Sequence, residues 1–480
     1  MAVDYDLVVV GSSWAGIYAA KNAALLQARV ALVTQSNNKY LPNDTLYNQS
    51  LGEIGSFNYR LENSPFITSE VQPNLVNLEQ TNYWLANINS TVQNINSLST
   101  LAALGVDVIV GHGEFYRLPQ LGLQVKQRSL RSRSFLLAVG TNFVPIFDSN
   151  NAKSYLTLRD LQNKNLSNLP LNLIIVGSDP TALALTQALA RIGKKITLVV
   201  ESRILPQEDL DISGHILAQL EAEGIEVFTN SVVSQIETIN HQKWLQAGNR
   251  ALVADEIIIA DYRQPNTAGL NLAGVGVKCD RRRIYVNSKL QTTNPSIYAC
   301  GDLIGGYCLQ NITRYEVNLI LKNSLFLPCY KTNYHTVPWV ILTQPNIARV
   351  GLSQFQAKQQ YPKNIFIIRQ YFSNLEQAQI TDNLTGLCKL IVRKDGAIIG
   401  CSIIGDRAKE LITIPALMMQ HQIKLDLNPM QGLTSLSIPM VYSGMSEILT
   451  RAFNDFYQQK MQQNPRLINR LKTWFSLRKN

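Results

Sequence analysis

The chain has 480 residues, which suggests about three domains at the usual ~100–200 residues per domain. Apolar residues make up 46% of it, close to the globular norm, so a wholly disordered chain is excluded. The formal charge is +10, but its basic residues are spread thinly outside residues 464–480, so the composition does not predict nucleic-acid binding.

The first predicted elements form a strand–turn–helix–strand unit. They are a β-branched strand over 5–10, the turn Gly11-Ser12-Ser13-Trp14-Ala15-Gly16, a helix over 17–26 and a strand over 29–33. Glycines at such a turn allow a tight bend, close approach to a pyrophosphate, and helix–strand packing. Here Gly11 and Gly16 are kept and Ser13 takes the middle place, while Thr34 stands where an acid usually holds ribose hydroxyls. The turn therefore predicts a nucleotide site, or a unit that packs this way without gripping adenosine.

The same unit returns in the second quarter of the chain. Its elements are a strand over 173–176, the turn Gly177-Ser178-Asp179-Pro180-Thr181-Ala182, a helix over 184–192 ended by Gly193, and a strand over 196–200. Asp179 would oppose a pyrophosphate unless its side chain turns away to cap the helix. Glu201 could hold ribose hydroxyls and would repel a 2′-phosphate, so NADH is expected rather than NADPH. Weak binding and a vestigial fold both remain open here.

The predicted pattern of strands and helices changes in the last part of the chain. A strand before Gly301-Asp302 is followed, beyond residue 337, by an α+β pattern. The predicted elements of this part are antiparallel strands over 340–342, 366–368 and 388–392, and helices over 407–421 and 446–459.

Cysteine usage and hydropathy bear on the cellular compartment. The first of the six cysteines is Cys279, and no C-x-x-C pair occurs, so no metal site is indicated. No apolar stretch reaches the ~18 residues of a membrane helix, and a strand beginning by Tyr5 leaves no room for a signal peptide. These features predict a cytoplasmic protein.

The two nucleotide-type turns, the Gly301-Asp302 segment and the stretch from Pro338 to Leu352, in this order, resemble the pyridine nucleotide–disulfide oxidoreductase family. That family includes dihydrolipoamide dehydrogenase, glutathione reductase and mercuric reductase. The resemblance implies two Rossmann-like domains, doubly wound parallel sheets that bind FAD and NAD(P)H, and a C-terminal α+β dimerisation domain that forms a homodimer. It implies that Gly11, Ser13, Gly16, Thr34, Gly140, Gly301 and Asp302 hold FAD, and that Gly177 and Glu201 hold the nicotinamide nucleotide.

The chain departs from this family where the family does its chemistry. By alignment, Asp44 and Gln49 fill the positions of the redox cysteine pair, and Glu53 and Ala184 fill those of a lysine–glutamate pair near the flavin. Dithiol chemistry needs a thiolate, so the resemblance implies no disulfide reduction at this site. The cysteine pair that mercuric reductases carry at the chain end is also missing, which argues against mercury reduction.

The family's C-terminal His–Glu acid–base pair is only half kept. Glu447 remains, but Tyr442 stands at the histidine position. Because a tyrosine of ordinary pKa near ~10 is a poor base at neutral pH, Tyr442 is expected to be an interface aromatic rather than a catalyst. These two residues are the weak candidates for catalysis.

The tail after residue 460 is amphipathic and basic. Its apolar positions at helical spacing are Leu467, Ile468, Leu471, Trp474 and Phe475, and its basic residues are Arg466, Arg470, Lys472, Arg478 and Lys479. It could contact a membrane surface weakly, or dock on the partner subunit. The shortness of the stretch slightly favours docking.

The expected domains are a first FAD-binding segment (1–148), an NAD(P)-binding domain (149–265), a central FAD-binding segment (266–333), a dimerisation domain (334–460) and the tail (461–480). The first hypothesis is an FAD-dependent oxidoreductase that passes hydride from NAD(P)H to FAD and on to a small non-disulfide acceptor. A second is a catalytically silent homologue that serves as a binding or scaffold dimer. A third is a membrane-associated NADH–quinone reductase.

Overall fold

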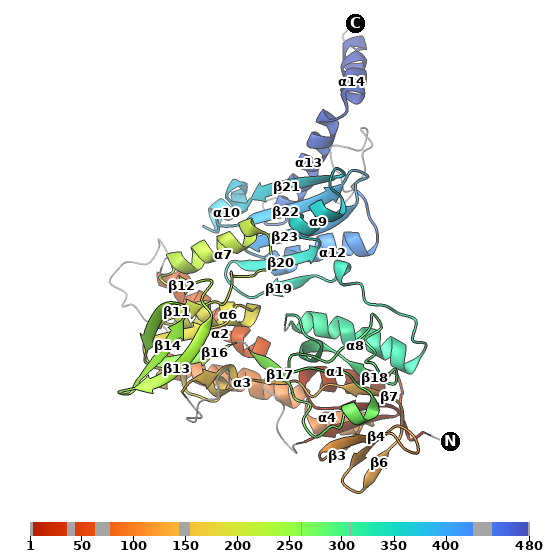
Figure 1. The fold of residues 1–480 in the computed structure, drawn as a ribbon. Helices are drawn as coiled ribbons and strands as arrows, with labels where there is room; N and C mark the ends of the chain where they lie inside the picture. The colour runs from red at the N-terminus through yellow and green to blue at the C-terminus, as the bar shows by residue number, and fades with distance from the viewer. Residues whose placement is uncertain are drawn as a thin grey trace. The chain divides into compact units, whose positions relative to one another are not determined.

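The structure is a computed structural model that describes residues 3–35, 44–62, 77–143, 154–260, 262–307, 309–425 and 444–478. The chain divides into two compact units (Figure 1). The first combines Met1–Leu205 with Leu220–Thr332, and the second combines Pro206–Gln219 with Asn333–Asn480.

A five-stranded sheet of order β18-β7-β1-β2-β3 is the base of the first nucleotide-type module. All its pairings are parallel, as in a doubly wound fold. Its strands are β1 (Tyr5–Val10), β2 (Val30–Thr34), β3 (Asp107–Val110), β7 (Ser132–Leu137) and β18 (Ile297–Ala299). Helices α1 (Trp14–Leu25) and α8 (Gln310–Leu325) contribute to one apolar core with the strands. The predicted parallel sheet is confirmed.

The second module repeats this plan with the order β12-β11-β10-β16-β9, again parallel throughout. Its strands are β9 (Leu156–Thr157), β10 (Asn172–Val176), β11 (Lys195–Val199), β12 (Glu226–Phe228) and β16 (Glu256–Ile259). Helix α6 (Pro180–Arg191) follows the turn, and Gly193 lies just past its end at φ +90°, as expected of a C-terminal cap.

Smaller elements complete the first unit. They are helices α2 (Asp44–Glu62), α3 (Leu78–Ile95), α4 (Leu98–Ala103) and α5 (Leu158–Gln162), the β4–β6 sheet (Gly113–Tyr116, Gly122–Val125, Arg128–Leu130), the β13–β15 sheet (Val233–Ile239, Gln242–Ala247, Arg250–Ala254), the pair β8 (Thr141–Phe143) with β17 (Arg263–Pro265), and the 3-10 turns η1 (Leu166–Asn168), η2 (Ala273–Val275) and η3 (Gly301–Ile304).

Where α2 packs against α6, a buried ion pair links the last residue of α6 to Glu223, just past the end of α7 (Leu210–Ala222). Arg191 and Glu223 lie 2.6 Å apart, with side chains 5% and 2% exposed. The Arg191 guanidinium also donates to the Ser56 hydroxyl at 3.2 Å and lies over the Tyr59 ring. The Asn58 side chain donates to the Arg191 carbonyl at 2.8 Å. Both residues of the pair are thus satisfied where solvent is excluded.

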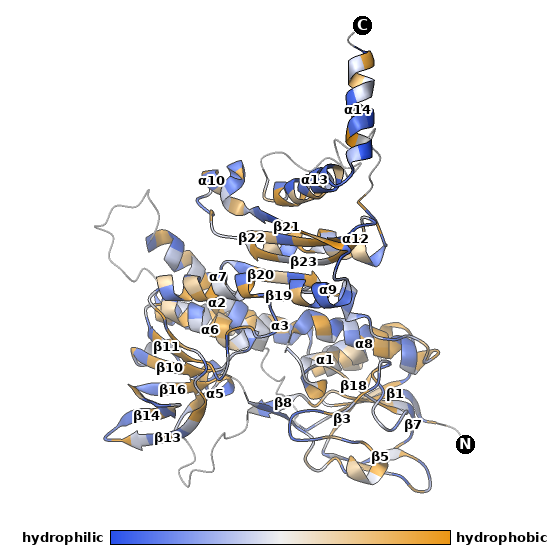
Figure 2. Ribbon diagram, turned by 45° about the horizontal axis from the view of Figure 1, so that its top comes forward, coloured by the Kyte–Doolittle hydropathy of each residue, from blue (hydrophilic) through white to orange (hydrophobic). Residues whose placement is uncertain are grey.

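The second unit has an antiparallel sheet of order β19-β20-β23-β22-β21, as predicted. The strands are β19 (Trp339–Ile341), β20 (Asn346–Gly351), β21 (Ile365–Tyr371), β22 (Leu387–Arg393) and β23 (Ile398–Gly405). The other elements are η4 (Tyr334–Thr336), η5 (Phe372–Asn374), α7 (Leu210–Ala222, shared with the first unit), α9 (Gln354–Gln360), α10 (Glu376–Ile380), α11 (Ala408–Leu411), α12 (Thr413–Gln420), α13 (Glu447–Gln462) and α14 (Pro465–Leu477). Figure 2 shows this sheet rich in hydrophobic residues, and Phe456 of α13 packs edge-on against Phe366 within the core.

The helix predicted over 407–421 is wrong in one respect, because it is two helices. Helix α11 ends at Leu411, and α12 begins at Thr413. Pro415 has no N–H to donate to the carbonyl four residues earlier, and its ring crowds that carbonyl. One continuous helix is therefore interrupted near Ile412.

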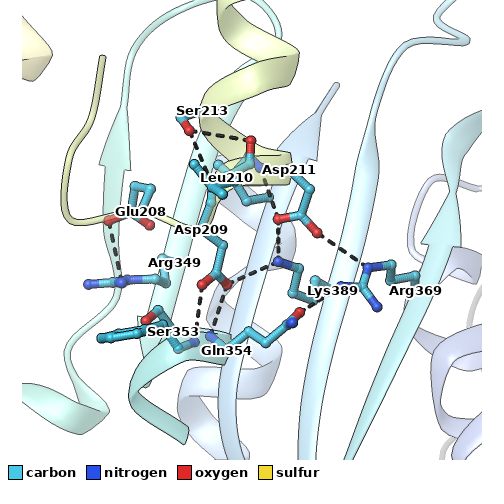
Figure 3. A network of polar contacts seen from close by, with 12 residues as sticks. Glu208, Asp209, Leu210, Asp211, Ser213, Arg349, Ser353, Gln354, Arg369 and Lys389 are labelled. Atoms are coloured by element: carbon cyan, nitrogen blue, oxygen red, sulfur yellow. Dashed lines mark hydrogen bonds and ion pairs between the residues drawn. The ribbon is translucent and has the colours of Figure 1, made fainter. Parts of the chain in front are cut away.

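The segment 206–219 is fixed to the second unit by acids that meet buried cations (Figure 3). Lys389 on β22 is 1% exposed and forms ion pairs with Asp209, at 3.0 Å, and with Asp211. Asp209 also accepts from the N–H groups of Gln354 and Phe355, where α9 begins. A buried lysine is tolerated here because its charge is paired and its hydrogens are bonded.

Candidate functional site

The predicted FAD residues converge at one edge of the first sheet. Strands β1, β2, β7 and β18 are parallel, so their carboxyl ends share an edge. Gly11, Thr34, Gly140 and Gly301 lie at or just beyond those ends. In open α/β sheets, ligands bind beyond the carboxyl ends of the strands. Four segments far apart in sequence are thus placed where such a ligand is expected.

The two glycines of the first turn are required by close packing. Gly11 has φ +110°, and a Cβ added to it would lie 2.4 Å from the Ala138 carbonyl oxygen. A Cβ on Gly16 would lie 2.1 Å from the Gly11 carbonyl oxygen. Both distances are far below a van der Waals contact, so no side chain fits at either position without displacing backbone. The turn, α1 and the strand end at Ala138 are therefore packed together closely.

Hydroxyl groups replace the missing glycine and acid of this turn. Ser13 is the N-cap of α1, and its Oγ accepts from the Gly16 N–H at 3.4 Å. The Ser12 and Thr34 hydroxyls are 2.8 Å apart, and Thr34 is only 2% exposed. The cap is neutral, so it leaves the positive end of the helix dipole uncompensated and open to an anion.

Asp302 lies in a polar cluster drawn from three segments. Its Oδ2 accepts from the Thr141 hydroxyl at 3.4 Å and from the Arg263 guanidinium at 3.5 Å. The N–H of neighbouring Gly301 donates to the Glu316 carboxylate at 2.7 Å. A carboxylate, a hydroxyl and a cation side by side can bind a ligand that carries hydroxyl and phosphate groups.

Two arginines near this site, Arg263 and Arg314, were not predicted from the sequence. Arg263, on β17, is the ion-pair partner of Asp302, although only its position after a buried strand could have signalled it. Trp14 stacks on Tyr18 with ring centroids 5.1 Å apart, and the Arg314 guanidinium lies over both rings. Their sequence separation of 300 residues hid the contact between Arg314 and Trp14.

Cys300 lies beside Gly301 but is not a ready nucleophile. Burial raises the pKa of its thiol well above the ordinary value, and the carboxylates of Glu316 and Asp302 raise it further. A thiol with a raised pKa carries little thiolate at neutral pH. Cys300 therefore behaves as a small buried apolar residue.

The second turn ends in a charged cap. Asp179 is the N-cap of α6, and its Oδ1 accepts from the Ala182 N–H at 2.8 Å. This is the turned-away conformation that the sequence required if a pyrophosphate is to approach. Glu201 follows β11 in an exposed position, and the Tyr262 hydroxyl donates to its carboxylate at 3.4 Å. Gly177, Asp179 and Glu201 all lie at the carboxyl edge of the second sheet.

The positions that align with the family's cysteine pair lie on α2. Asp44 is its first residue, and Gln49 is half-buried in the following turn. Beside them Tyr47 is 5% exposed, and burial raises the pKa of its hydroxyl above the ordinary range. Tyr47 is therefore neutral at neutral pH and offers a proton donor rather than a base.

Of the two weak catalytic candidates, Tyr442 lies outside the described residues and Glu447 lies within them. Glu447 opens α13 and forms an ion pair with Arg451, 2.7 Å away and one helical turn on. An acid in the first turn also suits the helix dipole, so these contacts give Glu447 a structural role.

Two parallel dinucleotide-type modules followed by an antiparallel α+β domain define a flavoprotein reductase architecture. In agreement, the family of pyridine nucleotide–disulphide oxidoreductases matches over residues 5–319, and the dimerisation domain of that family matches over residues 337–431. The chain belongs to this family, whose members are FAD-dependent oxidoreductases that use NAD(P)H. Its dimerisation domain indicates a homodimer.

Similar proteins span most of the chain. A mercuric reductase of Staphylococcus aureus is 28% identical over 439 residues, covering 88% of this chain and 78% of that protein. RclA of Escherichia coli, a probable pyridine nucleotide–disulfide oxidoreductase, is 26% identical, covering 86% and 92%. The crystal structure of LpdA from Mycobacterium tuberculosis has a TM-score of 0.81 at 21% identity, covering 94% and 99%, which supports the fold. Within the described residues, no helix is long and apolar enough to cross a membrane.

Proposed function

We propose that this chain is an FAD-dependent oxidoreductase that uses NAD(P)H and whose electron acceptor is not a disulfide. When bound, FAD would supply the two-electron chemistry between the nicotinamide and a small acceptor. The observation that carries the proposal is the convergence of Gly11, Thr34, Gly140 and Gly301 at one sheet edge.

The first module fits FAD through its backbone and its polar cluster. Gly11 and Gly16 let the strand end, the turn and α1 pack closely, which positions the N–H groups that begin α1 for a pyrophosphate. Ser13 and Thr34 offer hydroxyls to the adenosine half, and Gly140 and Gly301 let backbone pass close to the ligand. Asp302, oriented by Arg263 and Thr141, would accept hydrogen bonds from ribityl hydroxyls.

The absence of cysteine from residues 1–278 supports a non-disulfide acceptor. Asp44 and Gln49 align with the redox pair, and neither can attack sulfur. Cys300 has a raised pKa and is completely buried, so it is a poor substitute. Mercury reduction is not proposed, because no soft thiolate pair aligns with those of the mercuric reductases.

The second module would hold the nicotinamide nucleotide through Gly177 and Glu201. Exposed Glu201 can accept from ribose hydroxyls and would repel a 2′-phosphate, which supports NADH over NADPH. The Asp179 charge weakens this site even when the side chain caps α6. We place the homodimer in the cytoplasm, with the tail in contact with a membrane surface. We also retain the five domain segments expected from the sequence.

The test is anaerobic spectroscopy of the purified full chain. We expect visible flavin absorbance that NADH bleaches faster than NADPH does, and reoxidation by a soluble quinone but not by lipoamide or mercuric ion. Asp302→Ala should lose flavin, whereas Asp280→Ala, at an exposed acid, should keep it. Turnover with lipoamide would refute the non-disulfide acceptor.

A second candidate is a catalytically silent binding or scaffold dimer. Two features favour this candidate. The charged Asp179 cap opposes a pyrophosphate, and the Thr34 hydroxyl at the ribose position already contacts Ser12. A colourless protein that cannot be reconstituted with FAD would decide for this candidate. A yellow protein that ignores both nicotinamide nucleotides would remove only the role of the second module.

A further inference from the structure

Helix α14 (Pro465–Leu477) carries a surface that the rest of its unit does not use. The helix before it, α13, buries Ile448, Leu449 and Phe456 in the core of the second unit. In α14, by contrast, Trp474 is 56% exposed and Phe475 is 59% exposed. Large aromatics on a surface helix usually mark a contact with something outside the chain.

The charges around these aromatics are of one sign. Arg466, Arg470 and Lys472 are exposed, and no carboxylate within the described ranges lies at ion-pair distance from them. Arg478 lies over the Trp474 ring, 5.4 Å from its centroid, one helical turn away. Figure 2 shows hydrophilic and hydrophobic residues interspersed along α14. An uncompensated basic helix attracts an anionic surface.

Helical geometry separates the apolar residues of α14 from its basic ones, although Arg478, just past the end of the helix, projects onto the apolar arc. At 100° per residue, Ile468, Trp474 and Phe475 fall within an arc of about 120°. Arg466 and Arg470 flank this arc on one side, and Lys472 flanks it on the other. Aromatics that enter the headgroup region, with cations beside them at the level of the phosphates, are the arrangement of an interfacial helix. At 13 residues, α14 is too short to span a bilayer.

We propose that α14 binds the surface of anionic phospholipid membranes, lying in the interface with Trp474 and Phe475 inserted and its arginines and lysines on lipid phosphates. This rests on the membrane contact proposed for the tail, but not on the flavin chemistry. The length of the tail favoured docking on the partner subunit. The exposed aromatics and the uniformly basic charge of α14 favour binding to lipid. The helix has no acidic residue that could pair with a cation of a protein partner. A single short helix binds weakly, but a homodimer presents two to one membrane, and the second binds at high effective concentration.

The experiment is flotation of the full-length protein with vesicles of phosphatidylcholine alone and with vesicles that contain phosphatidylglycerol. We expect flotation with the anionic vesicles only, and its loss at high salt. Each basic residue near an anionic surface is worth about fivefold in affinity. Arg470→Glu with Lys472→Glu should therefore weaken binding by more than about tenfold. The matched control is Lys358→Glu with Lys363→Glu, which changes the net charge equally at exposed positions elsewhere in the unit.

Insertion of the aromatic face is tested separately. Trp474→Ser with Phe475→Ser should abolish flotation, whereas Phe355→Ser, at a residue 67% exposed on α9, should not. Anionic vesicles should shift the tryptophan emission to the blue, and Trp474→Phe should remove that shift.

Three results would overturn the proposal. They are equal binding to neutral vesicles, flotation that is indifferent to both α14 variants, and a truncation after Asn464 that turns a dimer into monomers without changing flotation. The last result would assign α14 to the partner subunit. Flavin absorbance is read from the same samples, so a failure of membrane binding stays distinct from a failure of the flavin site.

Discussion

The two nucleotide-type modules share one topology but end their first turns differently. In the first, Gly11 and Gly16 pack without side chains, and a neutral serine caps the helix. In the second, Ala182 replaces the last glycine and a charged aspartate caps the helix at 2.8 Å. A buried parallel sheet forms in both modules, so this topology is compatible with either turn.

The free N–H groups at a helix N-terminus can bind a capping side chain of the chain itself or an anionic ligand. A capping carboxylate satisfies one N–H and compensates the dipole, which stabilises the helix and lowers its attraction for another anion. A serine satisfies an N–H without adding charge. We therefore expect FAD to be held more firmly than NADH, and variants of the two turns and of Glu201 test that contrast.

The largest effect is expected at the buried Arg191–Glu223 ion pair beside the contact of α2 with α6. Arg191→Ala leaves Glu223, which is 2% exposed, as an uncompensated buried charge. The free energy of unfolding should fall by about 3–5 kcal/mol. Urea denaturation followed by circular dichroism measures it. Arg29→Ala breaks an exposed ion pair with Asp6 and should change stability far less, because water and salt screen an exposed pair. Equal losses of stability in the two variants would show that Arg191 and Glu223 do not form a buried ion pair.

The next effect compares the last position of each turn. Gly16→Ala puts a Cβ 2.1 Å from the Gly11 carbonyl oxygen, so α1 must shift. We expect a loss of about 1–3 kcal/mol in stability, together with loss of bound flavin. The matched variant Ala182→Gly introduces no clash and should cost about 1–2 kcal/mol through helix propensity and the loss of a buried methyl group. Flavin content and urea midpoints decide, and a Gly16→Ala protein with full flavin would contradict the close packing.

The alternation of buried strands with glycine turns was enough to predict both parallel sheets, and the α+β pattern beyond residue 337 predicted the antiparallel strands of the second unit. The Asp179 cap could also be foreseen, because aspartate before proline is a strong helix start. Arg263 and the Trp14–Arg314 contact could not, since they depend on how distant segments fold against each other. The placement of 206–219 in the second unit was hidden for the same reason: only the fold brings Asp209 to Lys389.

The caps themselves can be exchanged in charge. Asp179→Asn keeps a good N-cap and removes the charge, so NADH should bind about five- to tenfold more tightly, as ~1 kcal/mol for a charge near the protein surface implies. Ser13→Asp makes the reverse change in the first module and should weaken FAD binding by a similar factor. Dissociation constants from flavin bleaching and from fluorescence titration provide the comparison. Opposite signs in the two modules are the expected outcome, and equal signs would remove the electrostatic explanation.

The smallest effect is expected at Glu201. Glu201→Gln keeps the size of the side chain and an acceptor for ribose hydroxyls, but removes the charge that would repel a 2′-phosphate. NADH should bind about threefold less tightly, because a hydrogen bond to a charged group is stronger than one to a neutral amide. The ratio of the affinity for NADH to that for NADPH should also fall or approach one. Glu226→Gln removes the same charge from an exposed position on β12 of the same module and should leave both affinities unchanged. If both variants narrow the preference equally, the net charge of the module selects the cofactor, and Glu201 has no contact with the ribose.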